Sequence, residues 1–392
     1  MKSRRTNNEG SVYFDDNLKR YIGQFRYIDP ETGKNKRKKI TGLRKTEVLQ
    51  KGKQFIEMNN ELLANKKKGR LSEFIHKWLE TTVKPTVRQK TYERYEGILR
   101  CYIDPGIGDT ELGQINREML QLFFAKLKSN GGQNGKALSS STVNSTRRLL
   151  KTVFDVAVAD GVVSLNPVDR TKPMKLEKKQ LNIFTEEQYK SLLEAARQHS
   201  IMAYLVIRIA FATGFRIGEI FGLEYNAVDF INNTLTVKQT VISTRHGKVL
   251  QAMAKNGTSM RTIKVEKELI DELKDFKKIH DQRKAVFKNK YEQNHDFIIE
   301  NIDGTFCDPS YFTDKIFKRQ LLRNAGLPKE FRVHDCRHTH ASWLIERGVN
   351  IKVVSARLGH KSIRTTLDIY SHITPMMEDE AVNALAGVLQ PV

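Results

Sequence analysis

Residues 331–348 read FRVHDCRHTHASWLIERG and predict an amphipathic helix with one polar, basic side. Side chains three positions apart share a face of an α-helix, so His334 and Arg337 should point the same way. The apolar stripe that would face the core consists of Ala341, Leu344 and Ile345. We therefore expect a half-buried helix that presents an imidazole beside a guanidinium.

The same segment raises the question of a metal site. His334 and His338 are four positions apart, a spacing that zinc-binding helices also use. However, the segment has no acidic ligand of the HExxH type, and Arg337 would repel a divalent cation. The sequence therefore predicts no metal here, and no cofactor, since it also contains no GxxxxGK[ST] nucleotide-binding loop.

Residues 354–372, VSARLGHKSIRTTLDIYSH, contain a second group of candidate residues. Leu358-Gly359-His360 is expected to end a helix, because glycine is common just after a helix C-terminus. The chain then runs toward Tyr370, ten residues after His360. A single tyrosine at a helix end is commonly a packing residue, so its neighbours decide its role.

Residues 212–230, ATGFRIGEIFGLEYNAVDF, place Arg216 at a glycine-marked turn that opens an apolar helix. Glu219 follows three residues later on the same helical face. An ordinary ion pair within the helix is the simplest interpretation. It does not explain why the apolar side chains of Phe215 and Ile217 surround the cation.

A β-rich stretch covers residues 234–265. Its extended pattern rests on Leu235, Val237, Val241, Ile263 and Val265. Lys255 precedes Asn256-Gly257, a dipeptide that favours a hairpin turn. A lysine at a hairpin tip is usually only solvated, so Lys255 is informative only together with the other residues.

The pattern changes twice along the chain and predicts a multidomain, mainly α-helical protein. Residues 1–65 predict a small three-stranded β-sheet with one helix, and residues 71–166 an all-α domain. Residues 180–392 predict a mainly α domain with a small β-sheet, which a capping box at Thr185–Gln188 opens. The polar, lysine-rich segment 166–180 is typical of a linker.

Two sets of side chains are candidates for contact with DNA. The face of the N-terminal sheet that is turned away from its helix is expected to present Arg20, Gln24, Arg26, Lys36 and Lys38. A β-ribbon of this kind fits the major groove, and the alternative is a solvated charged face. In the all-α region, Arg147 and Arg148 belong to a basic group that could contact the DNA backbone.

The charge of the chain supports a polyanionic partner. The 392 residues include 67 Lys and Arg against 45 Asp and Glu, a net charge of +22. Residues 1–70 alone hold 19 basic and 8 acidic residues, a net charge of +11. The three cysteines and the absence of an apolar N-terminal or membrane-length stretch favour a reducing compartment without a membrane. Nucleic acid is then the preferred polyanion.

In this order along the chain, the candidate residues resemble those of the tyrosine recombinase family, of the phage-integrase type. The matching residues are Arg216, Glu219, Lys255, His334, Arg337, Leu358-Gly359-His360 and Tyr370. The resemblance is close over residues 180–385, while residues 71–166 look like the family's core-binding domain and residues 1–65 like its arm-binding domain. One residue departs from the family, because Asn256 stands where a threonine usually follows the lysine.

The resemblance implies a site-specific recombinase that cuts and rejoins DNA. Tyr370 would attack a phosphodiester, leaving a 3′-phosphotyrosine and a free 5′-hydroxyl. Arg216 and Arg337 would clamp the phosphate, since the guanidinium fork bonds phosphate oxygens in pairs. The remaining roles implied are general base for His334, general acid for Lys255, phosphate hydrogen-bond donor for His360 and support for Glu219.

The resemblance also implies partners and a location. We expect a homotetramer on double-stranded DNA with core and arm attachment sites, assisted by an excisionase or a host DNA-bending protein, in the bacterial cytoplasm at the nucleoid. The substrate would be a phage or an integrative element. The amphipathic tail after Tyr370 would dock on a neighbouring protomer or pack on its own domain. The rival functions are a topoisomerase that only relaxes DNA and a DNA-binding regulator with a decayed site.

Overall fold

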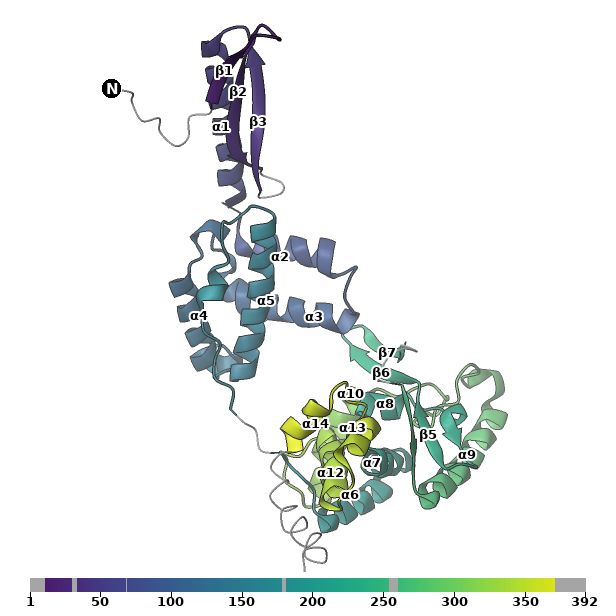
Figure 1. Ribbon diagram of the computed structural model, residues 1–392. Coiled ribbons are helices and arrows are strands. Elements are labelled where there is room, and N and C mark those ends of the chain that lie inside the picture. Colours follow the sequence, from purple (N-terminus) through teal and green to yellow (C-terminus); the bar gives the residue numbers. More distant parts are fainter. Residues whose placement is uncertain (1–10, 30–33, 68, 178–180, 254–259, 371–392) are drawn as a thin grey trace, which may run out of the picture. The chain divides into compact units, whose positions relative to one another are not determined.

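The computed structural model describes residues 11–29, 34–67, 69–177, 181–253 and 260–370. The chain divides into two compact units, residues 1–178 and 179–392. The division falls inside the lysine-rich segment 166–180. Each unit has its own hydrophobic core, and helices predominate in both (Figure 1).

The first unit begins with an antiparallel sheet in the order β1-β2-β3. Its strands are β1 (Ser11–Asp15), β2 (Arg20–Ile28) and β3 (Asn35–Gly42), and helix α1 (Lys45–Lys67) packs against it. Gly52 of α1 lies directly over Phe25 of β2, because a Cβ atom at that position would come within 2.0 Å of the Phe25 ring. The three-stranded sheet with one helix predicted for this region is confirmed.

The register of the sheet corrects the prediction for Lys36 and Lys38. Directly opposed residues of an antiparallel pair point to the same face. Lys36 is opposite Tyr27. Lys38 is opposite Phe25, on the face that α1 covers, and its ammonium lies 5.5 Å from the centre of the Phe55 ring of α1. The prediction that Lys36 and Lys38 share a face with Arg26 is therefore wrong.

The other face of the sheet has a different set of basic side chains. Arg20, Gln24 and Arg26 alternate along β2 and point to this face. Arg37 is the register partner of Arg26, and Lys39 is the partner of Gln24. We call Arg20, Gln24, Arg26, Arg37 and Lys39 the open sheet face.

The rest of the first unit is a helical bundle. Its helices are α2 (Leu71–Trp78), α3 (Gln89–Ile98), α4 (Arg117–Asn130) and α5 (Ser140–Ala159), and π-helical stretches extend α2 through Val83 and α3 through Gly108. The side chain of Asn116 caps α4 and that of Ser139 caps α5, so backbone N–H groups at both N-termini are satisfied. The core of the bundle includes Leu71, Ile75, Leu99, Leu150, Val153 and Phe154.

The second unit opens with three helices, α6 (Glu186–His199), α7 (Ile201–Thr213) and α8 (Ile217–Phe221). The predicted capping box is confirmed, because Thr185 and Gln188 exchange side-chain-to-backbone hydrogen bonds at the start of α6. Most side chains of α7 are buried, so α7 forms the centre of the core of this unit.

Two small sheets follow α8. One contains β4 (Val228–Asp229), β5 (Thr234–Val237) and β8 (Arg261–Lys264), and the other contains β6 (Gln239–Thr244) and β7 (Gly247–Ala252). The hairpin turn is at Arg245-His246, between β6 and β7. The prediction of a hairpin around Asn256-Gly257 is wrong for the flanking strands, because β7 pairs with β6 whereas β8 pairs with β5.

The remaining α-helices and a π-helical stretch complete the second unit. They are α9 (Lys267–Phe287), α10 (Pro309–Tyr311), a π-helical stretch (Phe312–Leu321), α11 (Leu322–Asn324), α12 (Val333–Glu346), α13 (Ile351–Leu358) and α14 (Ile363–Tyr370). α12 packs against both α7 and α13, and α13 packs against α14 (Figure 1). Of the helices that the structure describes, none has the length and apolar character needed to cross a membrane.

Candidate active site

A sharp turn between α7 and α8 presents Arg216. Gly214 ends α7 with φ +66°, in the left-handed region that favours glycine. Arg216 follows and donates from its backbone N–H to Glu219 Oε2 at 2.9 Å and from Nη1 to Glu219 Oε1 at 2.7 Å. The Arg216 side chain is 44% exposed and that of Glu219 only 2%. The buried Glu219 carboxylate thus holds Arg216 in place, while part of the Arg216 side chain remains exposed to solvent.

Glu219 is a buried carboxylate between two guanidinium groups. Its Oε2 also accepts a hydrogen bond from Arg261 Nη2, at 2.8 Å. Burial raises the pKa of Glu219, but Arg261 and Arg216 outweigh burial and hold the pKa below its usual range. Glu219 is therefore ionised at neutral pH. Arg261 was not predicted from the sequence, because its carboxylate partner is 42 residues away.

Arg337 connects three parts of the site. It lies on α12 and is 3% exposed. Its Nη1 donates to the carbonyl of Gly214 at 2.7 Å, and its Nη2 donates to the carbonyl of Leu358 at 2.6 Å. Each of these carbonyls is two residues before a predicted catalytic residue, Arg216 in one case and His360 in the other. One guanidinium therefore brings the α7–α8 turn and the end of α13 together.

His334 lies one helical turn before Arg337 on α12. Its ring meets that of His338 edge to face, with ring centres 4.8 Å apart. Crowding by protein atoms, and then the charges of His338, Arg337, Arg216 and Arg332, lower the pKa of His334 to about 4, although part of the residue still reaches the surface. His334 is therefore neutral near pH 7 and able to accept a proton.

His360 follows the glycine that ends α13. Gly359 has φ +65°, as the predicted glycine cap requires, and that prediction is confirmed. Nδ1 of His360 lies 2.8 Å from Oγ1 of Thr366 on α14. Burial, followed by the charges of Arg337 and Arg216, lowers the pKa of His360 to about 4. Arg337 and Arg216 lower the pKa of both histidines, so the four side chains lie within electrostatic range of one another.

Two predicted catalytic residues, Lys255 and Tyr370, lie wholly or partly outside the described residues. Lys255 lies outside the described residues. Tyr370 is the last residue of α14, ten positions after His360, and its side chain lies outside the described residues as well. A hollow of about 350 Å³ opens beside His360, lined by residues of α13 together with Gly359 and Ile363.

The basic residues predicted for the helical bundle have different environments. Arg147 of α5 donates from Nε to Thr171 Oγ1 at 2.9 Å and from Nη2 to the carbonyl of Thr171 at 2.9 Å. Arg147 therefore has a structural role that ties α5 to the segment after it. Arg148 is exposed and donates to Ser145 Oγ at 3.2 Å, and Arg94 of α3 donates to the same oxygen at 2.9 Å.

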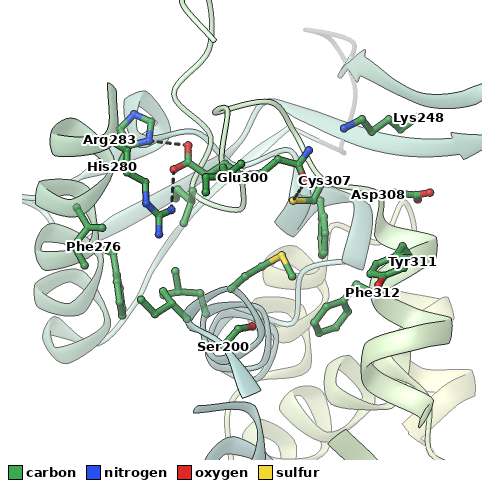
Figure 2. Close-up of a pocket in the computed structure, with 18 of the residues that line it drawn as sticks. Ser200, Lys248, Phe276, His280, Arg283, Glu300, Cys307, Asp308, Tyr311 and Phe312 are labelled. Carbon is green, nitrogen blue, oxygen red and sulfur yellow. Dashed lines mark hydrogen bonds and ion pairs between the residues drawn. The ribbon is translucent and has the colours of Figure 1, made fainter. Parts of the chain in front are cut away.

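A second hollow in the second unit lies apart from the predicted catalytic residues. It encloses about 780 Å³, and α7, α9 and α10 contribute to its apolar lining. Figure 2 shows the Glu300 carboxylate at its wall, between His280 at 2.8 Å and Arg283 at 3.7 Å. No predicted catalytic residue lines this pocket. Within the described part of the chain, no group of three or more His, Cys, Asp or Glu side chains is arranged to hold a metal ion.

Family models match both units of the chain. Residues 182–376 match the phage integrase family, and residues 70–128 match the N-terminal SAM-like domain of phage integrases. A tyrosine recombinase XerC-like protein of Caldanaerobacter subterraneus subsp. tengcongensis is 31% identical over 375 residues, which cover 91% of this chain and 93% of that protein. The ICEBs1 integrase of Bacillus subtilis is 26% identical over 76% of this chain and 78% of its own length.

Solved structures have the same fold. The Tn1549 transposon integrase in complex with transposon right end DNA superposes with a TM-score of 0.66 at 20% identity, over 80% of this chain and 100% of that chain. A lambda integrase tetramer bound to a Holliday junction gives a TM-score of 0.54 at 20% identity, over 92% and 94% of the two chains. The match to the phage integrase family and the relative of 31% identity show that the chain is an enzyme of the tyrosine recombinase family, the phage-integrase type.

Proposed function

We propose that this recombinase cleaves one DNA strand with Tyr370 and integrates and excises a mobile element. The observation that supports this most is the placement of Arg337, whose two hydrogen bonds join the turn bearing Arg216 to the helix end bearing His360. Two guanidinium groups and two neutral imidazoles within electrostatic range of one another suit a phosphodiester, because its non-bridging oxygens gain charge during displacement.

The proposed reaction is a transesterification. The phenolic oxygen of Tyr370 attacks the phosphorus in line, the bond from phosphorus to the 5′-oxygen breaks, and a 3′-phosphotyrosine forms. His334 takes the phenolic proton, and its lowered pKa of about 4 keeps the imidazole neutral, and so available as an acceptor, at neutral pH. Lys255 supplies a proton to the leaving 5′-oxygen. Attack by a 5′-hydroxyl of another strand reverses these steps and rejoins the DNA.

The other residues have supporting roles. Arg216 and Arg337 bind the non-bridging oxygens, because a guanidinium offers paired donors to phosphate. His360 donates a hydrogen bond to the phosphate, and Glu219 orients Arg216 through its two hydrogen bonds. The phosphotyrosine bond conserves the energy of the broken phosphodiester, so rejoining requires no nucleotide hydrolysis.

The names of the relatives support a mobile element as the substrate. The ICEBs1 integrase and the Tn1549 transposon integrase are both named after the element they belong to. The structure of the Tn1549 protein was solved in complex with transposon right end DNA. We propose the same class of substrate for this chain, in the bacterial nucleoid, with an excisionase or a host DNA-bending protein as a further partner. Recombination of two duplexes needs four tyrosines, so the proposed assembly is a homotetramer.

We further propose a division of the chain into three domains. Residues 1–65 would bind arm-type DNA sites through the open sheet face, residues 71–166 would bind the core site with Arg148 and its neighbours, and residues 180–392 would perform catalysis. The support is the basic character of the open sheet face and the match of residues 70–128 to a SAM-like domain.

The decisive experiment tests Tyr370. Nicked suicide duplexes that tile the DNA flanking the gene are incubated with the wild-type chain and with Tyr370→Phe, and products are separated on a denaturing gel. The wild type should form a covalent adduct on one duplex, whereas the variant should bind that duplex and form none. An adduct that persists in Tyr370→Phe would refute the assignment, and DNA relaxation without exchange between two attachment sites would favour a topoisomerase.

A further inference from the structure

Arg261 is a buried arginine that the proposed mechanism does not use. It begins β8, the first described strand after the segment that contains Lys255. Its side chain is only 7% exposed. A guanidinium has five N–H donors and stays charged, so burial is tolerated only where partners satisfy it. The identity of those partners therefore indicates what Arg261 does.

Two of its contacts lead to Arg216. Nη2 of Arg261 donates to Glu219 Oε2 at 2.8 Å, the oxygen that also accepts the backbone N–H of Arg216. The guanidinium carbon lies 4.8 Å from the ring centre of Phe215, the residue before Arg216. Arg261 thus holds both Glu219, the carboxylate that orients Arg216, and Phe215, the residue that precedes Arg216.

Two other contacts lead to His360. Nε of Arg261 donates to the carbonyl of Arg357 at 2.6 Å, near the end of α13. A Cβ atom added to Gly359 would lie 2.9 Å from Nη1 of Arg261, so the backbone of Gly359 packs directly on the guanidinium. His360 is the next residue. The arginine therefore contacts the chain on both sides of the predicted phosphate site.

We infer that Arg261 is a positioning residue for DNA cleavage, which sets the placement of Arg216 relative to His360 through Glu219 and the carbonyl of Arg357. The inference rests on the proposed function and assigns Arg261 no contact with DNA. Misplacement of a phosphate clamp by about 1 Å can cost about 100-fold in rate, so loss of this side chain should affect the rate of cleavage far more than DNA binding.

A positioning role for Arg261 predicts that its loss shifts the pH dependence of cleavage. A purely structural ion pair predicts no such shift. Glu219 faces two cations, Arg216 and Arg261, and Arg261 is the stronger influence in lowering its pKa. Removal of Arg261 should raise the pKa of Glu219, so that the carboxylate is protonated at a higher pH and releases Arg216 there. His360 faces Arg337, Arg216, Arg261 and His338, as well as the hydroxyl of Thr366, and loss of Arg261 would raise its pKa too. The acidic limb of cleavage should therefore move to higher pH.

Arg208 provides a matched control in the same unit. It lies on α7, its side chain is 15% exposed, and its Nη1 bonds Glu266 Oε1 at 2.5 Å, just after β8. Arg208→Gln thus removes a partly buried ion pair that also joins α7 to the segment following β8. Any general loss of stability should be seen in both glutamine variants, whereas an effect on the catalytic residues should be seen in Arg261→Gln alone.

The experiment compares full-length wild type, Arg261→Gln, Arg261→Lys and Arg208→Gln on the nicked duplex that the wild type cleaves. We expect Arg261→Gln to bind this duplex within about twofold of wild type, to cleave it about 100-fold more slowly in a single turnover, and to show an acidic limb at higher pH. Arg261→Lys should restore the wild-type limb, because a cation stays beside Glu219, with only part of the rate. Arg208→Gln should cleave at the wild-type rate.

The inference is overturned if Arg261→Gln equals Arg208→Gln in rate, or if its rate falls without displacement of the acidic limb. Thermal melting checks the fold of each variant. Should Arg261→Gln not fold, Arg261→Lys decides, since a wild-type rate for the lysine variant would contradict a positioning role for the guanidinium fork. Absence of an adduct with the wild type on every tiled duplex would instead refute the proposed function itself.

Discussion

Arg337 is held by two backbone carbonyls that come from segments more than 100 residues apart. A lysine has a single ammonium group and cannot reach both carbonyls while also binding a phosphate. We therefore predict that Arg337→Lys slows cleavage of the suicide duplex by about 100-fold or more and leaves DNA binding nearly unchanged. Single-turnover rates and gel-shift affinities measured on one duplex check this. A variant that cleaves within about threefold of wild type would contradict the role of the fork.

His340 provides a prediction about stability and pH. It is 6% exposed, and its Nδ1 lies 2.8 Å from the carbonyl of Phe211. Burial, and then the charge of Arg357, lowers its pKa from 6.5 to about 4. Between these values the unfolded chain binds a proton that the folded chain does not bind. The free energy of unfolding should therefore decrease as the pH falls from 6.5 to 4.

The variant His340→Gln should lose this part of the dependence, because glutamine does not titrate. A shift from 6.5 to about 4 corresponds to about 3 kcal/mol, so the wild type should lose about that much more stability than the variant between pH 7 and pH 4. Urea denaturation of both proteins across this range measures the difference. Parallel curves would show that His340 contributes nothing to acid sensitivity.

Local patterns predicted some residues of the site well and others not at all. The glycine caps at Gly214 and Gly359 depend on neighbours in sequence, so the turns that present Arg216 and His360 could be anticipated. Arg261 could not, because its bonds to Glu219 and to Arg357 span 42 and 96 residues. An isolated arginine at the start of a strand gives no indication of such distant partners.

At the level of elements, the two faces of the N-terminal sheet differ in what covers them. Arg26, Arg37 and Lys39 lie on the open sheet face, whereas Lys36 and Lys38 lie on the face covered by α1. We predict that replacing the first three by alanine weakens binding to arm-type DNA and reduces the slope of log affinity against log salt by about 3, since each phosphate contact contributes about 1. Fluorescence anisotropy over a salt series measures this slope.

The matched control for that prediction is Lys36→Ala with Lys38→Ala. It removes two charges from β3, the strand that also carries Arg37 and Lys39, but from side chains that contact Asp29 and Phe55. Its salt slope should remain close to that of the wild type. A slope reduced by about 2 in this control, in proportion to the two charges removed, would mean that affinity follows net charge alone, and the open sheet face would not be a specific DNA-binding surface.

The strands of this sheet are predictable from the sequence, but the prediction of which side chains of β3 share a face is wrong, and the reason is physical. In β2 the alternation of apolar and polar residues marks the two faces. β3 reads NKRKKITG and has a single large apolar residue, Ile40, so five consecutive polar positions carry no alternation. Only the pairing with β2 determines which lysines face α1. In the helices, an apolar residue recurs every three or four positions, so the sequence shows which face is buried.

At the scale of the whole molecule, the chain consists of two compact units, each with its own core. The proposed catalytic residues all lie in the second unit, and the open sheet face lies in the first. We predict that deletion of residues 1–65 removes footprints at arm-type sites while cleavage at the crossover site remains. DNase footprinting and the suicide assay on the same preparation test this, and unchanged footprints would contradict it.

In the proposed mechanism, one phosphorus atom is the common target of Arg216, Arg337, His334, His360 and Tyr370. The most direct measurement is an experimental structure of the chain trapped on the nicked suicide duplex. We predict a bond from the Tyr370 oxygen to phosphorus, with both guanidinium groups within about 3 Å of the non-bridging oxygens. A structure in which the phenol of neither the same nor a neighbouring copy meets both arginines at the phosphate would contradict it.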